Sequence, residues 1–221
     1  MNRSRHPRLV ACAALFLMIL AGLGAQDKPD ALKLYRNGRD LDAVGRVEDA
    51  RKAYAQAIEV CKLDLADNPK NMDAYAIYGW SLLRMGKYQD SVNVCLEALK
   101  SANDARIVET LGEGYFYLAN YKESLKYMER YIDTAPRGER ISTAYFFVGE
   151  IYRINQQFNR ADISYSAAVY LEPSISLWWF RLGSVRETVG DKRGATDAYQ
   201  RALKLRPDYK DASEGLTRVR T

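Results

Sequence analysis

The residue types that most often perform catalysis are nearly absent from this chain of 221 residues. Its one histidine, His6, lies in a basic stretch at the N-terminus. Serine and cysteine nucleophiles usually rely on a histidine as general base, and catalytic zinc is usually held by histidines. The chain beyond this stretch therefore lacks the groups for both kinds of chemistry.

Two of the three cysteines, Cys61 and Cys95, lie beyond the N-terminal stretch, inside the apolar segments AIEVC and VNVCLEAL. In such segments a free cysteine behaves as a small hydrophobic residue. Two separated cysteines are too few for a structural zinc site, which needs four ligands. We predict two buried thiols and no metal site, although an oxidising compartment leaves a disulfide open.

Two glycine-containing segments have a superficial likeness to phosphate-binding loops. Six residues separate Gly79 from Gly86-Lys87, where such a loop requires four, and Gly112-Glu113-Gly114 lies in a segment with helical spacing. Paired carboxylates can act without histidine, but no pair stands out among the many Asp and Glu residues. We therefore expect no enzymatic activity and no cofactor.

The formal net charge of +5 does not indicate a nucleic-acid partner. Arg3, Arg5 and Arg8 contribute three of these charges, and the segment 1–25 in which they lie contains no acid. Elsewhere Lys and Arg alternate with acids, as on a solvated helix surface, and form no basic patch. The charge pattern predicts no binding to nucleic acid.

The N-terminal segment 1–25 has the three-part layout of a secretory signal. Residues 1–8 are basic, Leu9–Leu23 are apolar, and Gly24-Ala25 precedes a polar stretch. The apolar run is shorter than the roughly 20 residues that span a bilayer. We predict a signal peptide at residues 1–25, cut after Ala25 or Gly24.

An uncleaved signal would instead tether the protein to a membrane through residues 9–23. Lipidation at Cys12 is disfavoured, because the apolar run follows this cysteine, where a lipoprotein signal has it in front. Both the cleaved and the uncleaved forms predict an exported protein, periplasmic or in the cell envelope.

The rest of the chain is organised by a repeat in which a glycine is followed at fixed distances by small and large residues. Four offsets recur after this glycine, namely +12, +16, +19 and, in three copies, +24. The copies are Gly183 with Ala195, Tyr199, Ala202 and Pro207; Gly149 with Ala161, Tyr165, Ala168 and Pro173; Gly112 with Ser124, Met128, Tyr131 and Pro136; Gly79 with Ser91, Cys95 and Ala98; and Gly38 with Ala50, Tyr54 and Ala57.

This pattern resembles the tetratricopeptide repeat (TPR) family, a helix–turn–helix unit of about 34 residues. The resemblance implies an all-α fold, a right-handed superhelical solenoid of about five TPR repeats plus a C-terminal capping helix. The repeats fall within residues 26–207, at about 31–70, 71–103, 104–140, 141–174 and 175–207, and residues 208–221 form the cap. The family motif is clearest in the fifth repeat, at Trp179, Leu182, Gly183, Ala195, Tyr199, Ala202 and Pro207.

Two irregular spacings predict local departures from this plan. The interval from Gly38 to Gly79 exceeds one repeat by about two helical turns. The added residues stay amphipathic, so we expect a longer second helix in repeat one. The interval from Gly112 to Gly149 is slightly longer than one repeat, and the excess falls in the polar segment 137–140, where we expect the most flexible connector.

The offsets also predict how the two helices of a hairpin meet. We expect the small residue at offset +12 to receive the close helix contact at the glycine. The large residue at offset +16 is expected to fill the space between hairpins.

The resemblance implies that first helices line a concave groove and that certain of their positions point into it. Five aromatic residues at these positions are expected to be exposed, interleaved with Arg and Glu, which are frequent anchors of protein interfaces. The predicted groove residues are Tyr35, Arg39, Trp80, Arg84, Glu113, Phe116, Tyr117, Phe146, Glu150, Arg153, Phe180 and Glu187.

We therefore interpret the chain as an exported scaffold that binds a partner protein or peptide in this groove. One alternative is a structural subunit of an envelope assembly, which would dock through its convex face or its ends. Another is a carrier of a small apolar ligand. The sequence leaves the oligomeric state and the identity of the partner open.

Overall fold

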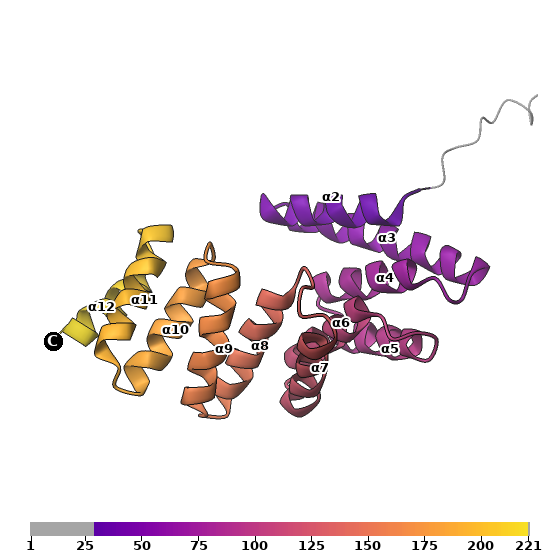
Figure 1. The fold of residues 1–221 in the computed structure, drawn as a ribbon. Coiled ribbons are helices and arrows are strands. Elements are labelled where there is room, and N and C mark those ends of the chain that lie inside the picture. Colours follow the sequence, from indigo (N-terminus) through magenta and orange to yellow (C-terminus); the bar gives the residue numbers. More distant parts are fainter. Residues whose placement is uncertain (1–28, 221) are drawn as a thin grey trace, which may run out of the picture. The chain divides into compact units, whose positions relative to one another are not determined.

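The computed structural model describes residues 29–220 of the chain. The predicted signal or anchor, with His6 and Cys12, lies outside the described residues. Residues 29–220 contain helices joined by turns and short connectors, and no strand (Figure 1). In this part of the chain, no helix combines the length and the hydropathy needed to cross a membrane.

The helices form hairpins that follow one another along the chain, with a single helix at the C-terminal end. The first helices of the five hairpins are α2 (Ala31–Ala43), α4 (Met72–Arg84), α6 (Ala105–Tyr117), α8 (Ile141–Ile154) and α10 (Ser176–Thr188). The second helices are α3 (Val47–Asp67), α5 (Tyr88–Leu99), α7 (Tyr121–Thr134), α9 (Phe158–Leu171) and α11 (Lys192–Leu205), and α12 (Lys210–Arg220) follows.

Each helix packs against the next one in the chain, and first helices also approach one another. Contacts join α2 to α4, α4 to α6, α6 to α8, and α10 to α12, whereas successive second helices of the described part make no comparable contacts. The fold is the all-helical repeat solenoid that the sequence predicts.

The close helix contact in each hairpin is made by the residue at offset +16 from the repeat glycine. A Cβ added at Gly38 would lie 2.5 Å from Tyr54, and one at Gly183 would lie 2.7 Å from Tyr199. The residue at offset +16, and not the predicted residue at offset +12, thus lies nearest to the space that the glycine leaves open. The larger side chain at offset +16 reaches across the hairpin because the glycine has no side chain to occupy that space.

The residue at offset +12 has a different task in the second and third hairpins. Ser91 donates a hydrogen bond from its hydroxyl to the carbonyl oxygen of Gly79 at 2.9 Å, and Ser124 does so to Gly112 at 2.7 Å. Both serines are fully buried, so the bond satisfies a hydroxyl that would otherwise destabilise the core.

Every hairpin turn contains one residue in the left-handed region of φ, seven positions after the repeat glycine. In three turns it is a glycine, with φ of 77° at Gly45, 73° at Gly86 and 84° at Gly190. In the other two it is Ala119 with φ 56° and Gln156 with φ 57°. These turns close all five hairpins in the same way, although only three have the residue that adopts this conformation without strain.

The helix lengths agree with the prediction for repeat one. Helix α3 has 21 residues, whereas the other second helices have 12 to 14. In its added turns Cys61 is buried and Leu65 is half-buried. At the other end, α12 buries Ala212, Gly215 and Val219 against the last hairpin and leaves a polar outer surface.

Candidate partner-binding surface

We call the surface formed by α2, α4, α6, α8 and α10 the first-helix face. The predicted groove residues on this face differ in their exposure to solvent, from buried to exposed. Tyr35 and Glu150 are buried, and Arg39, Arg84 and Tyr117 are exposed. The half-buried residues are Trp80, Glu113, Phe116, Phe146, Arg153, Phe180 and Glu187.

Only one of the five aromatic residues expected to be exposed is so, namely Tyr117, at 46% of its surface. Trp80 packs on Tyr35 with ring centroids 5.5 Å apart, and Phe146 stacks on Trp178 at 5.1 Å. Phe116 contacts a ring of α8 and Phe180 contacts a ring at the start of the cap. These four side chains therefore hold neighbouring hairpins together, and the expectation that they are exposed is wrong.

Ring contacts run without a break from the second hairpin to the fifth. Tyr88 stacks on Tyr117 at 4.7 Å, Tyr117 meets Phe147 edge-on at 6.1 Å, Phe147 meets Phe146 at 6.0 Å, and Phe146 stacks on Trp178. Tyr117 is the exposed member of this chain of rings. Because Tyr88 backs it, Tyr117 is held in a fixed orientation at the surface.

A partly buried ionic cluster lies beside Tyr117, where the third and fourth hairpins meet. Arg140, in the connector before α8, donates from Nε to Glu109 at 2.7 Å and from Nη2 to Glu113 at 2.7 Å. The amide of Arg140 also donates to the hydroxyl of Tyr131 at 3.2 Å. The connector that the sequence predicts to be the most flexible is thus anchored at three points.

Glu109 is the most buried member of this cluster, with 1% of its surface exposed. Burial raises its pKa to about 7, opposed by the positive charge of Arg140 and assisted by the negative charge of Glu113. Its Oε2 atom has no hydrogen-bond partner within residues 29–220. One arginine thus faces two carboxylates, with the guanidinium of Arg84 acting on Glu109 from α4.

Two further clusters lie toward the C-terminal end of the first-helix face. Buried Glu150 accepts from Arg153 at 2.8 Å, pairs with Arg181 of the next hairpin at 3.0 Å, and accepts from the hydroxyl of Tyr165. The structure thus brings the predicted residues Glu150 and Arg153 together.

The second of these clusters is centred on Glu187. It accepts from Arg218 of the cap at 2.7 Å and from the hydroxyl of Tyr199. The hydrogen bond from Arg218 lowers the pKa of Glu187. The predicted residue Glu187 therefore connects the fifth hairpin to the capping helix.

The sequence reasoning missed Arg140 and Tyr88, which are central to the arrangement around Tyr117. Arg140 lies in the segment that lengthens the third repeat, and that insertion was the signal that could have singled it out. Tyr88 belongs to a second helix, whereas the sequence pattern assigns the surface to first helices. No periodic signal marks it.

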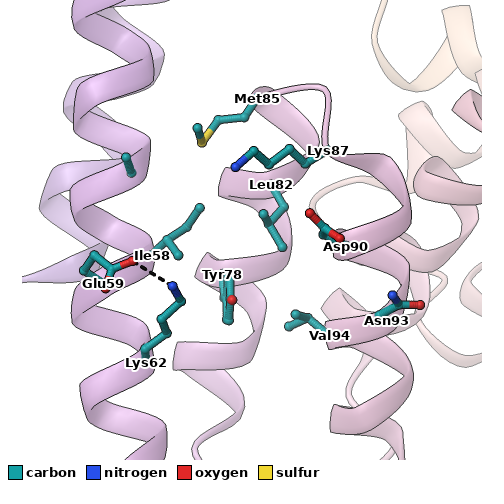
Figure 2. A pocket seen from close by; sticks show the side chains of 11 residues that line it. Ile58, Glu59, Lys62, Tyr78, Leu82, Met85, Lys87, Asp90, Asn93 and Val94 are labelled. Atoms are coloured by element: carbon teal, nitrogen blue, oxygen red, sulfur yellow. Dashed lines mark hydrogen bonds and ion pairs between the residues drawn. The ribbon is translucent and has the colours of Figure 1, made fainter.

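A cavity of about 360 Å³ lies away from the first-helix face, between α3, α4 and α5 (Figure 2). Its lining includes the Glu59–Lys62 ion pair on α3 and Lys87 and Asp90 near the start of α5. In Figure 2 the side chains of Lys62 and Lys87 extend into the opening from opposite walls. Its volume is at the lower end of ligand pockets. The larger apolar and aromatic side chains of the lining are those of Ile58, Tyr78, Leu82, Met85 and Val94.

The two cysteines of the described part are free and buried, as the sequence predicts. Burial raises the pKa of both thiols to about 12, so that neither is a reactive thiolate near neutral pH. Within residues 29–220, no three His, Cys, Asp or Glu side chains are grouped to hold a metal ion.

Family models with the description "Tetratricopeptide repeat" match residues 35–106, 142–175 and 179–209. Among curated proteins, the mouse Protein O-mannosyl-transferase TMTC1 is 31% identical over 101 residues, which are 45% of this chain and 11% of that protein. The human protein of the same name is 22% identical over 191 residues, which are 86% of this chain and 22% of that protein. The chain thus spans at most about a fifth of these relatives.

Solved structures with the same fold include TTC0263 of Thermus thermophilus, described as a thermophilic TPR protein. It has a TM-score of 0.64 and 18% identity, over 86% of this chain and 98% of that one. MamA of Desulfovibrio magneticus RS-1 has a TM-score of 0.62 and 22% identity, over 82% and 98% of the two chains. YrrB, described as a TPR protein with an unusual peptide-binding site, has a TM-score of 0.57 and 19% identity, over 87% and 94%.

Proposed function

Because this chain belongs to the tetratricopeptide repeat family, we propose that it is an exported scaffold that binds a partner protein or peptide on its first-helix face and catalyses no reaction. One scaffold of this kind serves many functions, so the proposal rests on the chemistry of the surface.

The observation that carries the proposal is the exposed, pre-oriented ring of Tyr117. Glu113 and Arg84 are close enough to act on its hydroxyl, and Tyr88 stacks on its far side. Tyrosine and arginine are enriched among the residues that dominate binding energy at protein interfaces. A ring that is already fixed loses little conformational entropy when a partner covers it.

A protein or peptide is the partner class that this chemistry favours. The surface offers one aromatic anchor within a set of alternating charges, which suits an extended or helical segment that carries both apolar and charged side chains. YrrB, which has the same fold, is described as having a peptide-binding site, and this supports the class of partner but not its sequence.

The absence of catalysis is proposed from the residues themselves. The only histidine precedes the repeats, and both thiols in the repeats are buried with raised pKa values. The likeness to an O-mannosyl-transferase covers at most 22% of that protein, so it supports a shared repeat architecture and no shared activity.

Export is proposed from residues 1–25 alone. The experiment is an intact-mass measurement on protein isolated from its source organism. A mass that corresponds to a chain starting at Gln26 or Ala25 supports cleavage, and the mass of the full chain from an exported compartment supports the tether. Full-length protein recovered from the cytosol would contradict both.

The binding surface is tested by photo-crosslinking in cells. A photoreactive amino acid at position 117 should capture one main partner, and Arg84→Ala in the same chain should lower its yield by about fivefold, because an interface anchor contributes roughly 1 kcal/mol or more. The matched control is position 170, since Tyr170 is a tyrosine with 85% exposure on the second helix α9. Equal capture at 117 and 170 would defeat the proposal.

A second candidate function is a structural subunit that docks through the second helices. Two observations favour it, namely the cavity between α3, α4 and α5 and the exposed apolar pair Ile163 and Tyr170 on α9. Crosslinks from position 170 or from Lys87, with none from 117, would select this alternative.

A further inference from the structure

The connector between α7 and α8 is held to helix α6 through one side chain. Arg140 bridges Glu109 and Glu113, which lie 31 and 27 residues earlier on α6. The side chain of Arg140 makes no capping hydrogen bond to α8, although this residue occupies the N-cap position. The guanidinium is therefore committed to α6, and the link between the connector and α6 depends on its pairing with the two carboxylates.

The two carboxylates differ in their access to water. Glu113 has 16% of its side chain exposed and Glu109 has 1%, whereas Arg140 keeps 38% exposed. Solvent can therefore stabilise the charges of Arg140 and Glu113, but the charge on Glu109 depends on nearby cations. When Glu109 is neutral, its attraction for Arg140 falls to that of an ordinary hydrogen bond.

Ionisable groups face this site from every element around it. Arg84 comes from α4, Cys95 from α5, Glu113 from α6 and Tyr131 from α7, while Tyr35 of α2 acts on Arg140. Burial raises the pKa of Cys95 and of Tyr131, so both stay neutral at physiological pH, and the arginines stay charged. Glu109, with its pKa raised to about 7, is thus the group whose charge changes near neutrality.

We infer that Glu109, Arg140 and Glu113 form a proton-operated latch, which fixes the connector between the third and fourth hairpins in neutral and alkaline solution and loosens it in mild acid. Arg140 lowers the proton affinity of Glu109 while the latch is closed, and this effect is lost when the guanidinium leaves. The open form therefore binds the proton more tightly, and by linkage acid favours opening.

The latch is tested by hydrogen exchange of the intact chain at pH 8 and pH 6, expressed as protection factors corrected for the intrinsic rate at each pH. The informative amides are those of residues 138–141, because the amide of Arg140 is hydrogen-bonded to Tyr131 and that of Ile141 to Gly138. Their protection should fall about threefold to tenfold at pH 6, while amides in the middle of α9 keep theirs.

Glu109→Gln is the decisive variant, since glutamine keeps the shape and can still accept a hydrogen bond. It should remove the pH response and leave the connector at the low protection that the unmodified chain shows at pH 6. Glu187→Gln is the matched control, because it neutralises another carboxylate paired with an arginine, far along the chain. It should leave the response of residues 138–141 unchanged.

Three results would overturn the latch. They are equal or higher protection of residues 138–141 at pH 6 in the unmodified chain, a pH response that survives in Glu109→Gln, or a Glu109 carboxyl that titrates near its ordinary value of 4.5. The last is measured by carbon-13 NMR on the unmodified protein, so it remains decisive even where the variant does not fold.

The latch concerns the chain alone, whereas its consequence for a partner rests on the function proposed above. Glu113 belongs both to the latch and to the surroundings of Tyr117. Loosening the connector should therefore weaken a partner held at Tyr117. A pH response without any crosslink at position 117 would retain the latch and reject the binding proposal.

Discussion

Gly86 and Ala119 occupy equivalent places in the turns of neighbouring hairpins, and both have a positive φ, 73° and 56°. Glycine adopts this conformation freely, whereas a side chain meets the following carbonyl and destabilises it by about 1 kcal/mol. The third and fourth hairpins, with Ala119 and Gln156, thus close under strain that the other three avoid.

Ala119→Gly and Gln156→Gly should each stabilise the protein by roughly 0.5 to 1 kcal/mol, because they relieve this strain at a small entropic cost. Urea unfolding followed by circular dichroism measures the change. Gly86→Ala is the reverse control and should destabilise by a similar amount. Loss of stability in both glycine variants would show that the turns are not strained.

Gly183→Ala should destabilise the protein by about 2 kcal/mol, because the new methyl group would lie 2.7 Å from the ring of Tyr199. In a chain that already carries Tyr199→Ala, the same substitution should leave the stability unchanged or raise it, because alanine has a higher helix propensity than glycine. Thermal unfolding of the four proteins gives this comparison. Equal effects of Gly183→Ala in both backgrounds would show that the ring does not restrict this position.

The buried tyrosines at offset +16 should make the protein unfold in alkali. Burial raises the pKa of Tyr54, Tyr165 and Tyr199 above the ordinary value of 10, assisted by hydrogen bonds to carboxylates. The folded state holds these protons while the unfolded chain releases them above pH 10, so stability is complete below that pH and falls above it.

Tyr54→Phe isolates one such group, because it removes the 2.6 Å bond to Asp42 and keeps the ring over Gly38. This substitution should destabilise the folded protein by about 1 kcal/mol at pH 7 and make the loss of stability above pH 10 smaller. Tyr170→Phe, at an exposed site, should change neither the stability at pH 7 nor its loss above pH 10. A phenol absorbance titration in which all tyrosines ionise near pH 10 would contradict the prediction.

Glu109 should make the whole fold more stable in mild acid, the opposite of its effect on the connector. Its pKa is higher in the folded state than in the unfolded chain, so the folded state takes up a proton between about pH 7 and 4.5. That contribution is present in acid and is lost as the pH rises through 7, on the order of 1 to 3 kcal/mol.

In Glu109→Gln the contribution of this group to the pH dependence should be absent, so the midpoints of urea unfolding at pH 5.5 and pH 8 should lie closer together than in the unmodified chain. The variant should be more stable than the unmodified chain chiefly at pH 8. Acid is expected to stabilise the whole fold and yet to loosen the connector, because the first effect compares the folded with the unfolded chain and the second compares the closed with the open connector. Glu109 becomes hydrated on global unfolding, whereas the latch requires that it stay buried when only the connector opens. A larger pH dependence in the variant than in the unmodified chain would refute the assignment.

Much of the fold was predictable because it rests on periodic, local features. The glycine at the start of each motif and the residue at offset +16 recur in every copy, and they meet wherever two helices form a hairpin. The long α3 was equally predictable, since its added residues keep the helical alternation. The turn position seven residues after each glycine was also present in the sequence, but Ala119 and Gln156 obscured it.

The candidate surface was predicted less well, because exposure depends on the neighbouring repeat. The repeat pattern assigns Trp80 and Phe146 to inward positions of their helices, yet Tyr35 and Trp178 of adjacent hairpins pack on them. A pattern within one repeat gives the direction of a side chain but not what lies beyond it. Tyr117 stays exposed because its contacts, with Tyr88 and Phe147, lie to its sides.

The sequence alone determined that this chain is an array of five helical hairpins with a capping helix, that its repeats lack histidine, and that Cys61 and Cys95 are core residues. The tertiary structure decided which inward residues reach solvent and brought Arg140 to Glu109, 31 residues away. The physical reason is that helix formation and hairpin packing follow short, regular spacings. Burial of a charge and its pairing are set by residues from several elements at once, and no spacing along the chain records them.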